Sequence, residues 1–287
     1  MVFDIVKKIF SVFISFAICF CIALLIFLIV LNNTMFNNSF AKETIKLSDY
    51  ALKIKDEMQQ EFTSLGSVSG FSPELFKTIV DNSELEMDII SSFKNLYEGK
   101  SQYKSEVFEF KLYNKLLKDS KSRGYVITNE IKSNLKYLAS VCNDIYNSAI
   151  SIPFYEQVSY LLQNGCKLCR LLILFTTVLT VIMLMILLII NIKNMRRFIR
   201  YCIYSISSCC LLLIIPLLLI YISKIIDRIA ILDVALKSLI VIFLYGILIE
   251  FFIAILIIII ILVILVILYN NLFYNFNFKT KSYIKKL

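Results

Sequence analysis

The chain has 287 residues, of which 59% are hydrophobic and 18% charged, and its mean hydropathy is +0.79. A soluble globular chain is usually ~45–50% apolar and ~25% charged, so this composition excludes a protein that folds entirely in water. The chain contains no His, which excludes Ser-His and Cys-His nucleophile pairs and His-containing zinc sites.

Four apolar stretches are each long enough to cross a membrane, because a hydrocarbon core of ~30 Å needs ~20 helical residues. The sequence therefore predicts an all-α chain with four transmembrane helices and an extracytoplasmic helical bundle between the first and second. The expected segments are 1–8 (cytoplasmic N-terminus), 9–31 (transmembrane), 32–170 (extracytoplasmic domain), 171–192 (transmembrane), 193–198 (basic cytoplasmic loop), 199–222 (transmembrane), 223–238 (external amphipathic loop), 239–268 (transmembrane) and 269–287 (basic cytoplasmic tail).

The first apolar stretch also has features of a signal peptide. Lys7 and Lys8 precede it, and Ser39 and Ala41 follow at a spacing compatible with cleavage. Its 23 apolar residues, however, exceed the ~7–15 that are usual for a secretory signal. We therefore expect it to stay in the protein as the first span.

Helical periodicity marks the extracytoplasmic segment. An apolar stripe from Leu47 to Leu65 predicts a helix over 43–65 that Gly66 and Gly70 interrupt. A second helix is expected from Ser72-Pro73-Glu74 to residue 97, with a weak point at 81–83 and a stop at Gly99. A third is expected over 105–118. A fourth stripe, from 127 to 149, ends before Pro153, and after it one long helix is expected to enter the second span, with Gly165 as the one breaker.

One part of this segment, residues 69–99, carries a distinctive pattern. It consists of the runs Ser69-Gly70-Phe71-Ser72-Pro73-Glu74-Leu75-Phe76, Asp88-Ile89-Ile90 and Asn95-Leu96-Tyr97-Glu98-Gly99. These runs resemble a pattern in uncharacterised four-span membrane proteins of low-GC Gram-positive bacteria, which share the layout of one span, a helical external domain and three further spans. The resemblance implies this topology and a bacterial plasma membrane, and it implies no activity.

The net charge of +9 lies beside the spans. Residues 32–170 hold 17 Lys/Arg and 17 Asp/Glu, whereas ten Lys/Arg flank one side of the spans and three lie in the opposite short loop. The positive-inside rule therefore places both termini in the cytoplasm. This distribution indicates the lipid bilayer as a partner and excludes a nucleic-acid surface. The ten residues that determine the topology are Lys7, Lys8, Lys193, Arg196, Arg197, Arg200, Lys279, Lys281, Lys285 and Lys286.

Three of the eight cysteines, Cys142, Cys166 and Cys169, are expected outside the membrane. The last two have C-x-x-C spacing, which is reactive when the first Cys begins a helix, and Gly165 could mark such a start. No alternation of strands and helices surrounds this pair, so redox catalysis is disfavoured. The alternative is a structural disulfide from Cys142 to one of the pair.

Two residues within the spans have unusual chemistry. Glu250 is the one acid in an apolar span, and such residues are often functional because a buried carboxylate is costly. The last apolar stretch is long enough that Glu250 could instead lie at the outer interface, so both interpretations remain open. Pro216 is expected to kink the third span.

The sequence contains no phosphate-binding Gly-rich loop and no paired-carboxylate motif. We therefore expect a non-enzymatic protein without cofactor or metal that senses, binds or scaffolds in the envelope, with other membrane or envelope proteins as partners. One alternative is a transport component similar in layout to ABC permeases of the cell-division and macrolide-efflux type. Others are an ion- or proton-coupled protein that uses Glu250 and a claudin-like membrane organiser, although the Trp, Gly and Cys signature of the latter is missing.

Overall fold

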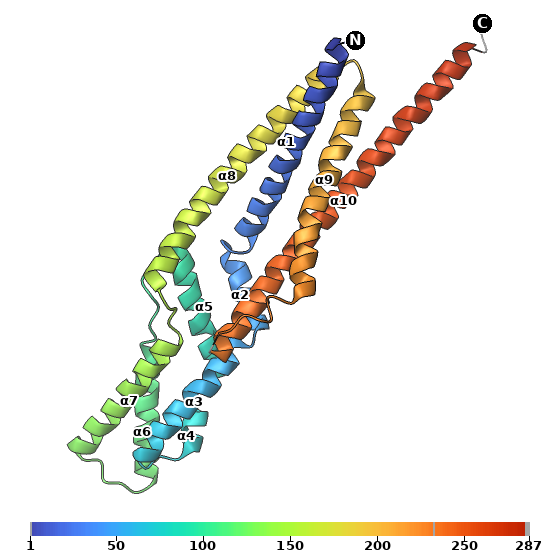
Figure 1. Cartoon of the computed structure of the whole chain (residues 1–287). Helices are drawn as coiled ribbons and strands as arrows, with labels where there is room; N and C mark the ends of the chain where they lie inside the picture. Colours follow the sequence, from blue (N-terminus) through green and yellow to red (C-terminus); the bar gives the residue numbers. More distant parts are fainter. Residues whose placement is uncertain (1, 232, 285–287) are drawn as a thin grey trace. The chain divides into compact units, whose positions relative to one another are not determined.

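A computed structural model describes residues 2–231 and 233–284, and in these residues the chain forms helices and no strands. The all-α class is thereby confirmed for the described part of the chain (Figure 1). The helices are α1 (Val2–Asn33), α2 (Asn38–Leu47), α3 (Tyr50–Val68), α4 (Pro73–Lys77), α5 (Asn82–Glu98), α6 (Val107–Ser122), α7 (Asn129–Ala149), α8 (Tyr155–Ile190), α9 (Met195–Ser223) and α10 (Val234–Ile284).

Four of these helices are long and apolar enough to cross a membrane, as predicted. They contain the candidate spans Val6–Asn33, Tyr155–Ile190, Met195–Ser223 and Val234–Asn271. Their uncovered faces are apolar, including Phe13, Phe16 and Leu219, whose exposed fractions lie between 60% and 68%. A surface of this kind is stable against lipid and not against water.

The chain divides into two compact units. We call Met1–Thr34, Cys166–Arg228 and Leu244–Leu287 the span unit. We call Met35–Gly165 and Ile229–Phe243 the short-helix unit. The division falls inside α8 and α10, so each of these helices contributes to both units.

Three stacked aromatic rings lie in the core of the short-helix unit. Phe62 on α3 stacks on Phe108 on α6 with ring centroids 5.8 Å apart, and Phe108 stacks on Tyr146 on α7 at 4.2 Å. All three side chains are buried, and pairs of this kind stabilise a core beyond the area that they bury. The helices are therefore joined by a common core of their own.

The predicted break at Gly66 is wrong, and close packing explains why. The helix α3 continues through Gly66 to Val68, and the ring of Phe76 lies where a side chain at position 66 would be, 1.9 Å from an ideal Cβ. Glycine is present here because the ring needs that space. The chain instead turns at Gly70, whose φ of +78° favours glycine. A second break separates α2 from α3 at Asp49, which also has a positive φ.

The helix expected from residue 72 to residue 97 is divided into α4 and α5 near the predicted weak point, and local signals mark the ends of both helices. Pro73 begins α4, and Asp81 caps α5 by accepting a hydrogen bond from the Ser83 amide. Gly99 ends α5 with a φ of +68°. Helix α8 runs unbroken through Gly165, as the prediction of one long helix required.

The start of α10 differs from the prediction. The sequence predicts an external amphipathic loop over 223–238, but α10 begins inside that range, at Val234. Between α9 and Val234 the described residues are not helical, and Leu232 lies outside the described part. Ala235 and Leu239 are buried in the core of the short-helix unit. Lys53 donates to Ser238 Oγ across 2.5 Å. The first turns of α10 therefore pack in this unit instead of forming a loop.

Helices α1 and α9 pack closely in the span unit. Small residues recur every four positions on α1, at Ser11, Ser15, Cys19 and Ala23, and all four are buried. The Ser15 and Ser205 hydroxyls lie 2.8 Å apart, and Ser205 Oγ also bonds the Ser15 carbonyl. Small residues of this spacing let helix backbones approach within a bilayer. The buried hydroxyls satisfy one another where water is absent.

Candidate functional site

Glu250 is half-buried on α10, and it makes no hydrogen bond or ion pair with the described residues. Two tyrosines bracket it along the helix: Tyr245 donates to Asp227 across 3.0 Å, and Tyr269 accepts from Arg200 across 2.9 Å. At 1.5 Å per residue, Glu250 lies about 7.5 Å from Tyr245 and about 28 Å from Tyr269. Tyrosines are enriched at membrane interfaces, so this spacing favours the interfacial interpretation over a mid-membrane acid.

The eight cysteines are all free thiols. Cys142 is completely buried in the core of the short-helix unit, and this burial raises its pKa to about 11. The alternative of a disulfide from Cys142 to Cys166 or Cys169 is thus not realised in this structure. Because α8 begins at Tyr155, the C-x-x-C pair lies inside a continuous helix and not at a helix N-terminus. Cys169 instead donates to the Leu28 carbonyl across 3.3 Å.

Most of the remaining predicted residues lie in the span helices, and Lys193 lies in the turn between α8 and α9. Pro216 lies inside α9, and its kink stays a prediction. Among the topology residues, Arg196, Arg197 and Arg200 lie in the first two turns of α9, while Lys285 and Lys286 lie outside the described part of the chain. Among residues 2–231 and 233–284, no group of three Cys, Asp or Glu side chains converges as a metal site.

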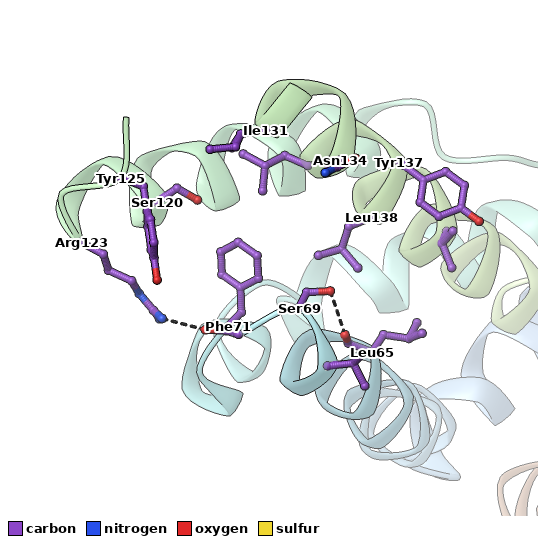
Figure 2. Close-up of a pocket in the computed structure, with 14 residues that line it drawn as sticks. Leu65, Ser69, Phe71, Ser120, Arg123, Tyr125, Ile131, Asn134, Tyr137 and Leu138 are labelled. Carbon is purple, nitrogen blue, oxygen red and sulfur yellow. Dashed lines mark hydrogen bonds between the residues drawn. The ribbon is translucent and has the colours of Figure 1, made fainter. Parts of the chain in front are cut away.

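A cavity of about 700 Å³ lies in the short-helix unit, and no sequence pattern predicted it. One wall is the end of α3 and the turn that follows it, and the other is formed by the end of α6 and by α7 (Figure 2). The lining residues are Leu65, Val68, Ser69, Gly70, Phe71, Ser120, Arg123, Tyr125, Ile131, Asn134, Leu135, Tyr137, Leu138 and Val141.

Arg123 is held at one edge of this cavity. Its Nη1 donates to the Gly70 carbonyl across 2.9 Å, and its Nε lies 2.8 Å from Asp119 Oδ2. Its guanidinium also lies 5.8 Å from the centroid of the Phe71 ring. Figure 2 shows Phe71 between Arg123 and Leu138, with Tyr125 beside the arginine. These contacts join the turn after α3 to the end of α6.

The cavity has the composition of a small-molecule site. Aliphatic and aromatic side chains dominate its lining, and the polar groups are few, as is usual for ligand pockets of ~300–1,000 Å³. Among the lining residues, Val68 is 91% exposed and Tyr137 is 73% exposed. Apolar side chains that remain exposed beside a concave surface indicate a place where a ligand completes the burial.

One sequence signal could have pointed to this cavity. Gly70 has a positive φ and Phe71 lines the pocket beside it. Both belong to the run Ser69-Gly70-Phe71-Ser72-Pro73-Glu74-Leu75-Phe76. The opposing wall begins at Ser120, and it has no local signal that sets it apart from an ordinary amphipathic helix.

Comparison with protein-family models found no match, and neither the curated proteins nor the solved structures include a detectably similar chain.

Proposed function

We propose that this chain is a multi-pass plasma-membrane protein with both termini in the cytoplasm, and that its short-helix unit lies outside and binds a ligand of the cell envelope. The protein acts as a sensor, binding protein or scaffold and not as an enzyme. The span helices link the ligand-bound state to partner proteins in the membrane.

The observation that carries this proposal is the cavity of about 700 Å³ between α3, α6 and α7. It is lined mainly by apolar side chains, and it belongs to a unit with its own core. The positive-inside distribution supports the external location of that unit, because the ten flanking Lys/Arg belong on the cytoplasmic side.

The alternatives have less support. An external module with strands and helices would favour the permease-like transport component, and the described residues contain no strand. The coupling hypothesis needs Glu250 deep in the bilayer, and its spacing from Tyr245 favours the interface.

The test is to purify the full chain in mild detergent and to identify by mass spectrometry any small molecule that stays bound. Asn134→Phe adds an aromatic ring at an exposed position that lines the cavity, so we expect the bound molecule to be lost from this variant. The matched control is Asn114→Phe, an exposed position on α6 that does not line the cavity. A molecule retained equally by both variants contradicts the proposal.

A further inference from the structure

We infer that the ligand is a single-chain amphiphile with an anionic head group, its acyl chain lying in the cavity and its head group at Arg123. This inference rests on the proposed function and adds the chemical class of the ligand. It is supported by the lining of the cavity, the available donors of Arg123 and the charge of the segment that forms the α6–α7 wall.

The lining matches an acyl chain. Leu65, Phe71 and Ile131 present aliphatic and aromatic groups from both walls, and Leu135 and Leu138 lie between them on α7. Arg123 is the one charged side chain among the lining residues. A long polar molecule would lose its hydration here without gaining hydrogen bonds.

Arg123 can bind an anion at the edge of the cavity. A guanidinium has five N–H donors. Nε forms an ion pair with Asp119, and Nη1 donates to the Gly70 carbonyl. The Nη2 group has no hydrogen-bond partner in the described chain. The guanidinium is held in place by these contacts and by the Phe71 ring, and a held fork of donors suits a carboxylate or phosphate.

The segment that forms the α6–α7 wall of the cavity carries a positive excess. Residues 111–136 hold seven Lys/Arg and two Asp/Glu, although residues 32–170 as a whole are balanced at 17 of each. Four exposed lysines of this region make no ion pair or hydrogen bond with the described residues. They are Lys118, Lys121, Lys132 and Lys136. A local positive field of this kind attracts anions and raises their association rate.

The absence of Trp from the chain provides a direct binding assay. We would place a single Trp in the cavity with Tyr125→Trp, and a second at a distant exposed position of the same unit with Phe110→Trp as the control. The full chain is reconstituted in nanodiscs of zwitterionic phosphatidylcholine. Three brominated quenchers with one acyl chain are then added: a fatty acid, its methyl ester and a lysolipid with an anionic phosphate head.

We expect saturable quenching at position 125 and only weak quenching at position 110. The half-quenching concentration should be about tenfold lower for an anionic quencher than for the ester, which is the ratio expected for one charge-assisted hydrogen bond. The stronger of the two anionic quenchers identifies the head group as carboxylate or phosphate. Lys121→Gln with Lys136→Gln should weaken anionic binding by about two- to fivefold and leave the ester unchanged, whereas Lys42→Gln, at an exposed position of α2, should change neither.

Equal half-quenching concentrations of the anionic quenchers and the ester at position 125 would contradict the inference of an anionic head group. Equal quenching at positions 125 and 110 would overturn the acyl ligand altogether. Neither result contradicts the proposed function. That proposal is tested separately, and it fails if Asn134→Phe retains the co-purified molecule as well as Asn114→Phe does.

Discussion

The Tyr146 hydroxyl donates a hydrogen bond to Asp88 Oδ2 across 2.7 Å, and this bond joins α7 to α5 inside the short-helix unit. The second carboxylate oxygen of Asp88 accepts from the Tyr103 hydroxyl at 2.8 Å. Tyr146 is 3% exposed, and its ring stacks on Phe108. One carboxylate thus holds two tyrosines that lie 43 residues apart in the chain, beside the aromatic stack of the core.

Replacing Tyr146 by Phe should destabilise the protein by about 1.5–3 kcal/mol, because a buried hydrogen bond to a carboxylate is lost while the ring packing is retained. The measurement is thermal unfolding of the full chain, followed with a dye that reacts with the buried cysteines as they become exposed. Tyr113→Phe is the control, since the Tyr113 hydroxyl makes no hydrogen bond with the described residues. Equal melting temperatures for Tyr146→Phe and the unchanged protein would contradict the role of this bond.

The protein should lose stability at alkaline pH. Burial, together with the hydrogen bond to Asp88, raises the pKa of Tyr103 to about 12 from 10.0. Burial is likewise the main cause that raises the pKa of Tyr146, and it raises that of Cys142 to about 11 from 9.0. Groups whose pKa is higher in the folded state contribute stability below their unfolded pKa and lose it as the pH rises. We therefore expect the melting temperature to fall from about pH 9 to pH 12, and a constant value over this window would contradict the burial of these groups.

The stability of the protein should depend on the size of the side chain at position 235, at the start of α10. Ala235 is completely buried in the core of the short-helix unit, whereas the neighbouring Val234 is 66% exposed. Ala235→Leu should therefore cost about 1–3 kcal/mol of stability through overpacking, and Val234→Leu should change stability by less than about 0.5 kcal/mol. The same thermal unfolding measurement applies. If Ala235→Leu leaves the melting temperature unchanged, α10 does not complete this core.

The topology can be tested by cysteine labelling in intact cells, in a background without the native cysteines. We expect an impermeant thiol reagent to modify Asn114→Cys, because residue 114 lies in the segment assigned to the outside. Asn194→Cys and Lys286→Cys should stay unmodified until the cells are opened. Labelling of Asn194→Cys in intact cells would reverse the assignment.

The depth of Glu250 can be measured in the same background. If Glu250 lies at the outer interface, Glu250→Cys should react with the impermeant reagent as readily as Val234→Cys. Ile257→Cys is the control for mid-membrane depth, since Ile257 lies midway between Tyr245 and Tyr269. If Glu250 lies at the outer interface, Glu250→Gln should also have little effect on insertion or function. A reactivity as low as that of Ile257→Cys would restore the hypothesis of a functional intramembrane acid.

The sequence by itself determined the properties that depend on neighbouring residues. The four candidate spans follow from hydropathy summed over ~20 residues. The end of α5 at Gly99 follows from the positive φ that glycine adopts without strain, and the start of α4 follows from the fixed φ of Pro73. Each of these preferences acts over a few positions, and so it can be recognised without knowing what the segment packs against.

Only the tertiary structure decided which surfaces meet. Gly66 has the local character of a helix breaker, yet the Phe76 ring that packs against it makes it part of α3. Ala235 and Ser238 have no local feature that assigns them to a core 185 residues earlier in the chain, where Lys53 bonds Ser238. The cavity likewise arises where the turn at Gly70 faces α7. Burial and cavity shape depend on contacts between distant segments, and residue periodicity carries no information about the partner of a helix face.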